Sequence, residues 1–358
     1  MKEAKTPALR VLSPGLLTTL QDLGREGYQH LGIPVSGALD PMSLRAANAL
    51  VGNPLGTGAL EVAVVGPTLA IDADDVRMAF VGAKAAIEIL PDVTASAGTL
   101  IGSNESIRLR RGDIVRIGAL WNATTLYVAV EGGFDVVPAL GSVSTYIRGG
   151  LGGFAGRALA AGDRLPLVRN TATERDEYRL DRFDLGLPKR FRVVAGPQSD
   201  YFSETARAKF FGGEYTIVGS DRMGMRLDGP KIEHLRGYNI TSDAIAPGSI
   251  QVPGNGKPIV LLADRQTTGG YPKIATVISA DLAALGRLPI GAKLSFEPVS
   301  IEAAIEARRQ MLAEIAAIED RIVPLVPEAT GVAPRLFDNN NLISGIIDGK
   351  LDEQGRVA

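Results

Sequence analysis

The sequence contains no cysteine, two histidines and one tryptophan among its 358 residues. The lack of cysteine excludes disulfides, thiolate nucleophiles and zinc sites built on cysteine. A His-rich metal site or a Ser-His-Asp arrangement would have to use His30 or His234. Either histidine is more often a structural or surface residue, so we expect no metal site.

Excess charge and long apolar runs are also missing. The 38 Lys and Arg residues nearly balance the 40 Asp and Glu residues, which argues against a large nucleic-acid or lipid footprint and favours small-molecule or protein partners. No apolar run approaches 18 residues, and the first ten residues are not followed by the apolar region of a signal peptide. We therefore expect a cytoplasmic protein that does not span a membrane.

Glycine and proline are plentiful, at 42 and 21 residues, and they bound short apolar segments. This pattern is typical of many short strands joined by turns, so the predicted fold class is mainly β. The predicted strands are Leu60–Val65, Val76–Phe80, Ala85–Leu90, Ile114–Ile117, Thr125–Val130, Arg192–Ala195, Tyr215–Val218 and Pro258–Leu262.

The chain is long enough for two domains, and its composition changes abruptly at residues 168–190. Dense mixed charge there, ending in Leu187-Pro188, is typical of a solvated crossing between domains. We predict a first domain over 1–170, a linker over 171–190, a second domain with a terminal helix over 191–322, and a flexible tail over 323–358.

The two predicted domains share an ordered set of turn signals. Such a repeat favours two related β-barrels, although a chance match among so many glycines is the alternative. The first set is Gly66-Pro67, Gly112-Asp113-Ile114, Gly132-Gly133 and Gly162 to Leu165, and the second is Gly229-Pro230, Gly248-Ser249-Ile250, Gly269-Gly270 and Gly291 to Leu294.

Helix signals are few. Asp40-Pro41 predicts a helix start and Gly52 its end. A second short helix is predicted over 279–286. The longest runs over 300–322, where an apolar stripe predicts packing on the second barrel or on a partner.

Two generic motifs have ordinary explanations. The glycine-rich stretch Gly149–Gly156 contains a G-x-G-x-x-A match, but no strand and helix flank it as in a dinucleotide-binding unit, so a loop is the better interpretation. Gly254–Pro258 lacks the spacing of a phosphate-binding loop and resembles a hairpin turn.

Three polar clusters interrupt the apolar segments: Thr18–Arg25 running on to Gly32–Asp40, Gly219–Leu227, and Leu262–Pro272. In the second, Arg222 and Arg226 would share a face if both lay on a strand, where they could bind an anion or pair with nearby aspartates. In the third, a strand leads into a turn whose paired glycines let a ligand approach the backbone. The alternative is an Asp264-Arg265 surface pair beside a capped turn.

These clusters resemble the KipA/PxpC family, also called allophanate hydrolase subunit 2, over about residues 8–300. The resemblance is carried by VLSPGLLTTLQDLGREGYQHLGIPVSGALDPMSLRAANALVGN, by GSDRMGMRLDGP, and by SDAIAPGSIQVPGNGKPIVLLADRQTTGGYPKIATVI. It implies two cyclophilin-like β-barrel domains. Ala244 and Met225 depart from the family pattern, which puts the pocket shape there in doubt.

The resemblance implies a subunit of an ATP-using 5-oxoprolinase, a hydrolase that opens 5-oxoproline to glutamate together with a KipI/PxpB-type and a PxpA-type subunit. The alternatives are a biotin-dependent carboxyltransferase subunit similar to urea carboxylase, a regulatory KipA-type antagonist of a sensor-kinase inhibitor, and a plain peptide-binding barrel. The sequence has no ATP-grasp-like segment and no internal Met-Lys pair for biotin attachment, so ATP or biotin chemistry would need other subunits.

Carried onto this sequence, the resemblance implies a site in the second and third clusters. The candidates for proton transfer are Asp264, Tyr271 and Asp243. The candidates for substrate binding are Arg222, Arg226, Gln251, Arg265, Gln266, Thr267, Thr268, Gly269 and Gly270.

Overall fold

The computed structural model describes residues 6–92, 94–183 and 185–325. The described residues up to Val323 belong to one compact unit. Most of the predicted tail over 323–358 lies outside the described residues. Within the described ranges, no helix is long and apolar enough to cross a lipid bilayer.

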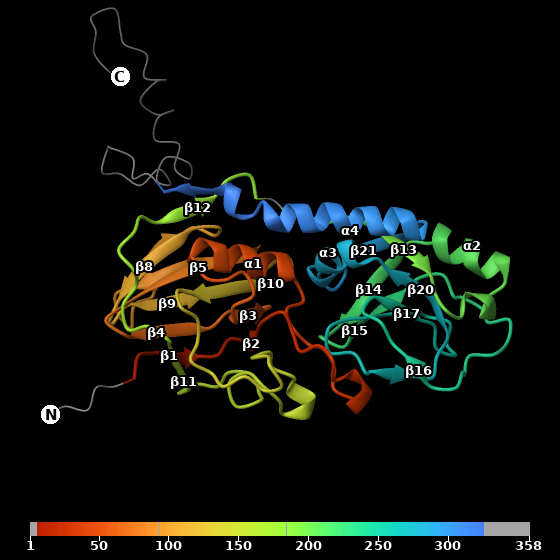
Figure 1. The fold of residues 1–358 in the computed structure, drawn as a ribbon, viewed down its shortest axis with the longest axis horizontal. Helices are drawn as coiled ribbons and strands as arrows, with labels where there is room; N and C mark the ends of the chain where they lie inside the picture. The colour runs from red at the N-terminus through yellow and green to blue at the C-terminus, as the bar shows by residue number, and fades with distance from the viewer. Residues whose placement is uncertain (1–5, 93, 184, 326–358) are drawn as a thin grey trace, which may run out of the picture. The chain divides into compact units, whose positions relative to one another are not determined.

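Two sheets make up the first half of the chain (Figure 1). One has six strands in the order β11-β1-β4-β9-β6-β7, and the other has five in the order β2-β3-β10-β5-β8. Their bounds are β1 Ala8–Ser13, β2 Leu17–Gln21, β3 Ala59–Ala63, β4 Thr68–Asp72, β5 Asp75–Lys84, β6 Ile87–Leu90, β7 Thr99–Ile101, β8 Ser106–Arg110, β9 Ile114–Ile117, β10 Trp121–Val130 and β11 Arg164–Pro166.

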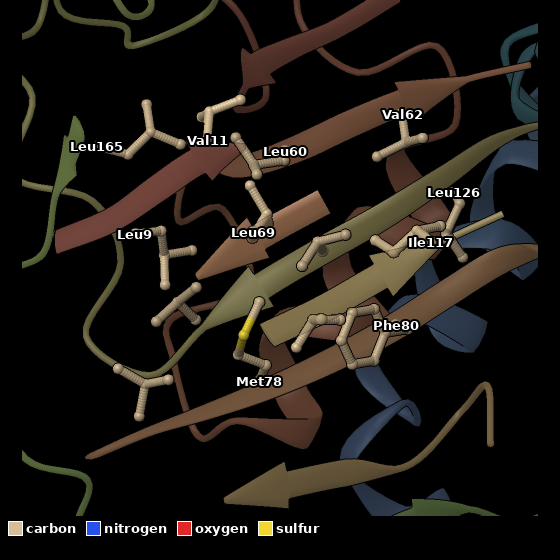
Figure 2. Close-up of a cluster of buried hydrophobic side chains, with 14 of the residues drawn as sticks. Leu9, Val11, Leu60, Val62, Leu69, Met78, Phe80, Ile117, Leu126 and Leu165 are labelled. Carbon is tan, nitrogen blue, oxygen red and sulfur yellow. The ribbon is translucent and has the colours of Figure 1, made fainter. Parts of the chain in front are cut away.

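The two sheets bury a common apolar core. Figure 2 shows Leu9 and Leu69 of the six-stranded sheet beside Met78 and Phe80 of the five-stranded sheet, and all four side chains are fully buried or nearly so. Burial of each such side chain contributes roughly 1.5–3 kcal/mol. Because alternate residues of a strand face opposite sides, this core uses Val76, Met78 and Phe80 of β5.

The other face of the five-stranded sheet is covered by α1, Pro41–Leu50 (Figure 1). The side chain of Asp40 accepts from the backbone N–H of Met42 and Ser43, and Pro41 occupies the first helical position. Gly52 follows with φ of 73°, a conformation that favours glycine. The predicted start and end of this helix are therefore confirmed.

Seven strands of the second half close into a barrel in the order β13-β20-β17-β18-β15-β14-β21. A separate two-stranded ribbon pairs β16 with β19. The mainly β prediction is confirmed. The bounds are β13 Arg190–Ala195, β14 Tyr215–Ser220, β15 Gly224–Asp228, β16 Asp243–Ala244, β17 Ser249–Gln251, β18 Ile259–Leu261, β19 Thr268–Gly269, β20 Lys273–Val277 and β21 Lys293–Pro298.

Helices α2, α3 and α4 accompany the barrel. The predicted helix over 279–286 is a 3-10 turn at Ser279–Asp281 followed by α3, Leu282–Gly286. The long predicted helix is α4, Ile301–Ala316, capped by the Ser300 side chain. Sequence analysis missed α2, Glu204–Gly212, although Ser203 provides a side-chain N-cap that could have indicated it.

The apolar stripe of α4 is only partly covered. Ala307 is buried within the helix, and Ile318 beyond its end packs into the core beneath α1. Ile301, Ile305 and Leu312 remain exposed. The helix contacts β13 and the 3-10 turn at Ser279–Asp281, so its buried side faces the second half.

The charged segment predicted as a linker over 171–190 contacts the first half. Arg77 of β5 donates to the backbone carbonyls of Thr173 and Arg175 and to the carboxylates of Glu131 and Glu177. Strand β12, Tyr178–Leu180, pairs with β22, Ile322–Pro324. Strands β1–β11 and β13–β21 fall on either side of this segment, and independent folding of the two domains stays a prediction.

Candidate functional site

A buried ion cluster joins the two halves of the chain. Arg222, in the turn before β15, donates from Nε to Asp264 Oδ2 at 2.8 Å and from Nη2 to Asp264 Oδ1 at 3.1 Å. Its Nη1 donates to Glu61 of β3, and Nη2 also donates to the Gly37 carbonyl at 2.6 Å. We call Arg222, Asp264 and Glu61 the junction cluster.

Glu61 is held in place by the first half. It lies opposite Tyr127 in the pairing of β3 with β10, and the Tyr127 hydroxyl donates to Glu61 Oε2 at 2.5 Å. The Leu39 N–H donates to the same oxygen at 2.9 Å, and the Asp40 N–H donates to the Tyr127 hydroxyl. Burial, with added repulsion from Glu61 and Asp40, raises the pKa of Tyr127 well above its usual range, so this hydroxyl stays protonated.

The junction cluster is saturated by its own contacts. Burial alone would lower the pKa of Arg222, but attraction to Glu61 and Asp264 outweighs burial and raises it, so the guanidinium stays charged. The contacts of Nε, Nη1 and Nη2 occupy four of its five N–H groups. Since Arg222 binds Asp264 of its own half and Glu61 and Gly37 of the first half, the geometry favours a clamp between the halves over a site that binds substrate.

A second set of contacts reinforces this junction. Arg287 Nη1 lies 3.1 Å from Asp40 Oδ2, and both side chains are buried. Thr124 of β10 donates twice, from its hydroxyl to the Gly286 carbonyl and from its N–H to the Arg287 carbonyl. A Cβ on Gly286 would lie 2.4 Å from the Leu39 carbonyl oxygen. The backbones of the two halves therefore approach closely at the end of α3.

The first polar cluster, around Thr18–Arg25, also has a structural role. Asp22 accepts from the Ser142 hydroxyl and the Val143 N–H, and Arg25 donates to the Ser144 carbonyl. Burial lowers the pKa of Arg25, partly offset by Asp22 and Asp264. These contacts fasten the loop that follows β10 onto the loop that follows β2.

Arg265 is buried next to the junction cluster. Its Nε donates to the Ile245 carbonyl at 3.0 Å and its Nη1 to the Leu262 carbonyl at 3.3 Å. Burial lowers its pKa to about 10, against an opposing attraction from Asp264. Arg265 therefore ties the end of β16 to the segment after β18, which places the ribbon relative to the barrel.

A second polar group gathers where the ribbon meets the barrel. In the ribbon, Asp243 pairs with Gly269. In the barrel, Gln251 of β17 pairs with Lys273 of β20. A Cβ added to Gly269 would lie 2.6 Å from Gln251 Nε2, so the ribbon and the barrel strands are in contact there. We call Asp243, Gln251, Gly269, Lys273 and Gln198 the ribbon cluster.

Asp243 is the accessible carboxylate of the ribbon cluster, with its side chain 46% exposed. Its Oδ2 accepts from Lys273 Nζ at 2.7 Å and from Gln198 Nε2 at 3.1 Å, and its Oδ1 accepts from the Ala244 N–H. The hydrogen bond from Lys273, followed by that from Gln198, lowers the pKa of Asp243. Gln251 is buried, and its Nε2 has no hydrogen-bond partner. The ribbon cluster thus contains an ionised acceptor, the Asp243 carboxylate, and a donor without a partner, Gln251 Nε2.

The remaining predicted residues are more open. Arg226, Gln266, Thr268 and Tyr271 are exposed, and Thr267 and Gly270 are partly buried. Arg222 and Arg226 do not both lie on a strand, so the condition for sharing a face is not met: Arg222 precedes β15 and is buried, while Arg226 lies on β15 and is exposed. Gln266 Nε2 would lie 3.6 Å from a Cβ on Gly269, which puts it beside the ribbon cluster.

A hollow of about 400 Å³ lies apart from both clusters and includes none of the predicted site residues. It is lined by Gly82, Lys84, Ser103, Asn104, Asn122, Ala123, Phe183, Leu185, Gly186 and Leu187.

Comparison with known proteins identifies the family of this chain. The family model described as "Carboxyltransferase domain, subdomain A and B" matches residues 31–298, a range that contains both the junction and the ribbon clusters. The chain belongs to this carboxyltransferase-domain family. It is 34% identical over 303 residues to the C-type subunit of 5-oxoprolinase from Escherichia coli strain K12, a match that covers 84% of this chain and 94% of the relative.

Other members of the carboxyltransferase-domain family match similarly. The C-type subunit of 5-oxoprolinase from Haemophilus influenzae is 38% identical over 301 residues, covering 82% of this chain and 91% of the relative. The solved structure of the Kluyveromyces lactis urea amidolyase has a TM-score of 0.80 and 29% identity. That match covers 90% of this chain but 21% of the much longer urea amidolyase chain.

Four residues of this carboxyltransferase-domain chain escaped sequence analysis as site residues: Glu61, Tyr127, Gln198 and Lys273. Glu61 lies in an apolar strand, ALEVA, and a lone carboxylate in such a strand is a usable signal of a buried ion pair. Tyr127 and Lys273 carry no comparable signal, because their importance depends on the strands opposite them.

Proposed function

We propose that this chain is the C-type subunit of an ATP-dependent 5-oxoprolinase that opens 5-oxoproline to glutamate. The proposal is supported above all by the match to the C-type subunit of the E. coli 5-oxoprolinase, which covers 84% of this chain and 94% of that subunit. In this role it would act with a KipI/PxpB-type and a PxpA-type subunit.

The ribbon cluster is the part of the chain that we assign to substrate. Opening a cyclic amide requires a donor for the carbonyl oxygen and a group that moves a proton to the ring nitrogen. Gln251 Nε2 is a buried donor with no partner, and Asp243 is an ionised carboxylate open to solvent. The N–H groups near Gly269 and Gly270 could add further donors, since neither residue has a side chain to block approach.

We assign the junction cluster a supporting role. The contacts of Arg222 with Asp264 and Glu61 leave little capacity for a substrate oxyanion. Removing Arg222 would leave the buried carboxylates of Asp264 and Glu61 without their common partner, which is strongly destabilising. Asp264 would accordingly hold the two halves in register, and Asp243 would be the proton-transferring carboxylate.

We assign ATP to the partner subunits. A phosphate cradle needs backbone N–H groups pointing into an open turn. In the glycine-rich loop over 149–156, the N–H groups of Gly149, Gly150, Leu151, Gly153 and Gly156 donate to backbone carbonyls instead. These five donors are therefore already used and do not form such a cradle.

The alternative is carboxyl transfer from biotin to an amide nitrogen, favoured by the match to the urea amidolyase structure and by the family description. The same ribbon cluster could bind an acyclic amide such as urea. A regulatory protein that antagonises a kinase inhibitor and catalyses no reaction would not need the pairing of an ionised Asp243 carboxylate with the unpartnered Gln251 Nε2.

Reconstitution tests these roles. The chain would be purified with its KipI/PxpB-type and PxpA-type subunits, and glutamate and ADP would be measured after addition of 5-oxoproline. Formation of both products only when this chain is present supports the proposal. Stimulation of ATP hydrolysis by urea in the presence of a biotin carrier would favour the carboxyltransferase, and full 5-oxoprolinase activity without this chain would overturn the proposal.

A further inference from the structure

Lys273 is the buried lysine among the residues that the structure describes, with 1% of its side chain exposed. Lysine is almost never fully buried unless it is paired, because removing an ammonium group from water costs several kcal/mol. Its Nζ donates to Asp243 Oδ2 at 2.7 Å and to the Ala244 carbonyl at 3.1 Å. Both acceptors belong to β16.

The segment that follows β13 packs against the backbone of Lys273. Gly196 packs so closely on β20 that a Cβ there would lie 2.1 Å from the Lys273 carbonyl oxygen. Two residues later, the Gln198 side chain accepts from the Lys273 N–H and donates to Asp243. Asp243 therefore accepts hydrogen bonds from Lys273 of β20 and from Gln198 in the segment after β13, and these two segments pack against each other.

A second lysine–aspartate pair provides a natural comparison. Lys257 Nζ also lies 2.7 Å from a carboxylate, that of Asp228, but the two side chains are 51% and 52% exposed. An exposed pair of this kind contributes about 0–1 kcal/mol and is screened by salt. The Lys273–Asp243 pair differs because the lysine is buried while the carboxylate is accessible to solvent. A bound ligand would therefore contact Asp243, and the charge of Lys273 would affect the ligand by its effect on that carboxylate.

We propose that Lys273 is a positioning residue that keeps Asp243 ionised and aimed at the substrate, while Gln251 Nε2 donates to the carbonyl oxygen of the bound amide. The inference rests on the function proposed above. In the ring-opening step, water forms the new C–O bond and gives one proton to the Asp243 carboxylate. The C–N bond then breaks and Asp243 passes that proton to the ring nitrogen, with ATP consumed at the partner subunits as the driving reaction.

The charged and titratable groups around Asp243 are few. Lys273 of β20 is the charged side chain in contact with it among the described residues. Arg265 reaches the backbone of Ile245, two residues along the chain, and Tyr271 follows β19 with its side chain exposed. Asp200, near Gln198, pairs with Arg236 at the surface. A change in the acid side of a pH profile after removal of Lys273 would therefore report mainly on Asp243.

The test compares wild type, Lys273→Met, Asp243→Asn and the double variant in the reconstituted complex. For each, kcat and KM for 5-oxoproline are measured from about pH 3 to 8, a range that extends low enough to include the acid limb of a carboxylate with a lowered pKa. Without the ammonium group, Asp243 takes up a proton more readily, so the acid limb of kcat/KM should move up by about one pH unit in Lys273→Met. Asp243→Asn should lose about 100-fold in kcat, a typical contribution of proton transfer.

The double variant and a matched control separate this role from loss of structure. If Lys273 acts through Asp243, the double variant should be no slower than Asp243→Asn. Lys257→Met removes the exposed lysine of the comparison pair and should keep the wild-type profile. Circular dichroism and assembly with the partner subunits check folding. If Lys273→Met does not assemble, the kinetics of Asp243→Asn decide the test, because the Asp243 side chain is half exposed and its replacement should not prevent folding.

Each result bears on one claim. No turnover of 5-oxoproline by the wild-type complex would overturn the proposed function itself. With an active wild type, an unshifted acid limb in a folded Lys273→Met, or near wild-type kcat in Asp243→Asn, would overturn this inference and leave the proposed function standing.

Discussion

Arg222, in the turn before β15, and Asp264, in the segment after β18, face each other and are joined by two hydrogen bonds of 2.8 and 3.1 Å. Glu61 of the first half accepts from the same guanidinium. A planar guanidinium can satisfy two carboxylates at once, which an ammonium group cannot do with the same geometry. The junction between the halves therefore depends on arginine at this position.

Replacing Arg222 with lysine should destabilise the protein by about 3 kcal/mol, since one buried carboxylate would lose its partner. The measurement is the free energy of unfolding in urea. Arg226→Lys is the control, because that side chain is exposed on the neighbouring strand and its replacement should change stability by less than about 0.5 kcal/mol. Equal stabilities of the two variants would contradict the clamp.

Gly269→Ala should reduce activity of the reconstituted complex at least about 10-fold while leaving it assembled, because the new methyl group would lie 2.6 Å from Gln251 Nε2 and 2.7 Å from Ile245 Cδ1. Steady-state kinetics on 5-oxoproline measures the effect. Gly212→Ala offers a control at the end of α2, where an added Cβ meets nothing within 4 Å. Undiminished turnover in Gly269→Ala would argue that substrate does not use the ribbon cluster.

Arg265→Ala removes the donors to the Ile245 and Leu262 carbonyls. Each buried carbonyl left without a partner costs about 1–3 kcal/mol, so the loss of both partners should lower the free energy of unfolding by about 2–6 kcal/mol. Because Ile245 follows β16 directly, amide hydrogen exchange of the ribbon should rise more than that of the barrel strands. Activity should fall as well. Uniform exchange rates in ribbon and barrel would show that Arg265 does not hold the ribbon.

Glu131 gives the protein a stability that depends on pH. Burial would raise the pKa of Glu131, but hydrogen bonds from Thr173 and from Arg77 outweigh burial and lower it. A carboxylate with a lowered folded pKa stabilises the protein above its unfolded pKa of about 4.3, and this contribution is lost as the pH falls through the folded value.

Glu131→Gln should therefore lower the free energy of unfolding by about 3 kcal/mol at pH 7, and the difference from wild type should shrink below about pH 4. Thermal or urea unfolding between about pH 3 and 7 provides the comparison. A difference that stays constant across this range would mean that ionisation of Glu131 does not contribute.

Local features of the fold were readable from the sequence because they depend on neighbours in the chain. Asp40-Pro41 and Gly52 specify the two ends of α1 through an N-cap, a fixed φ and a left-handed residue. Strands such as Ile114–Ile117 were found from short apolar runs between turns. Helix α2 was missed since its sequence, ETARAKFFG, has little apolar periodicity.

The candidate site was less predictable. Asp243, Gln251 and Gly269 were expected from the resemblance, yet nothing local distinguishes them from Asp264 and Arg222, which pair with each other and with Glu61. Arg222 and Glu61 are 161 residues apart. Whether a polar side chain has all its hydrogen bonds made within the protein, or is free to bind a ligand, depends on contacts between residues this far apart in the sequence.

The sequence by itself determined the strand and helix segments, the mainly β class and the motifs that place the chain in its family, because periodicity, capping and turn chemistry act over a few residues. Only the tertiary structure decided that Lys273 is buried beneath Asp243 while Lys257 is exposed. That distinction comes from strand register: Lys273 lies opposite Gln251 under the ribbon, and a shift of one residue would turn its side chain to the other face of the barrel.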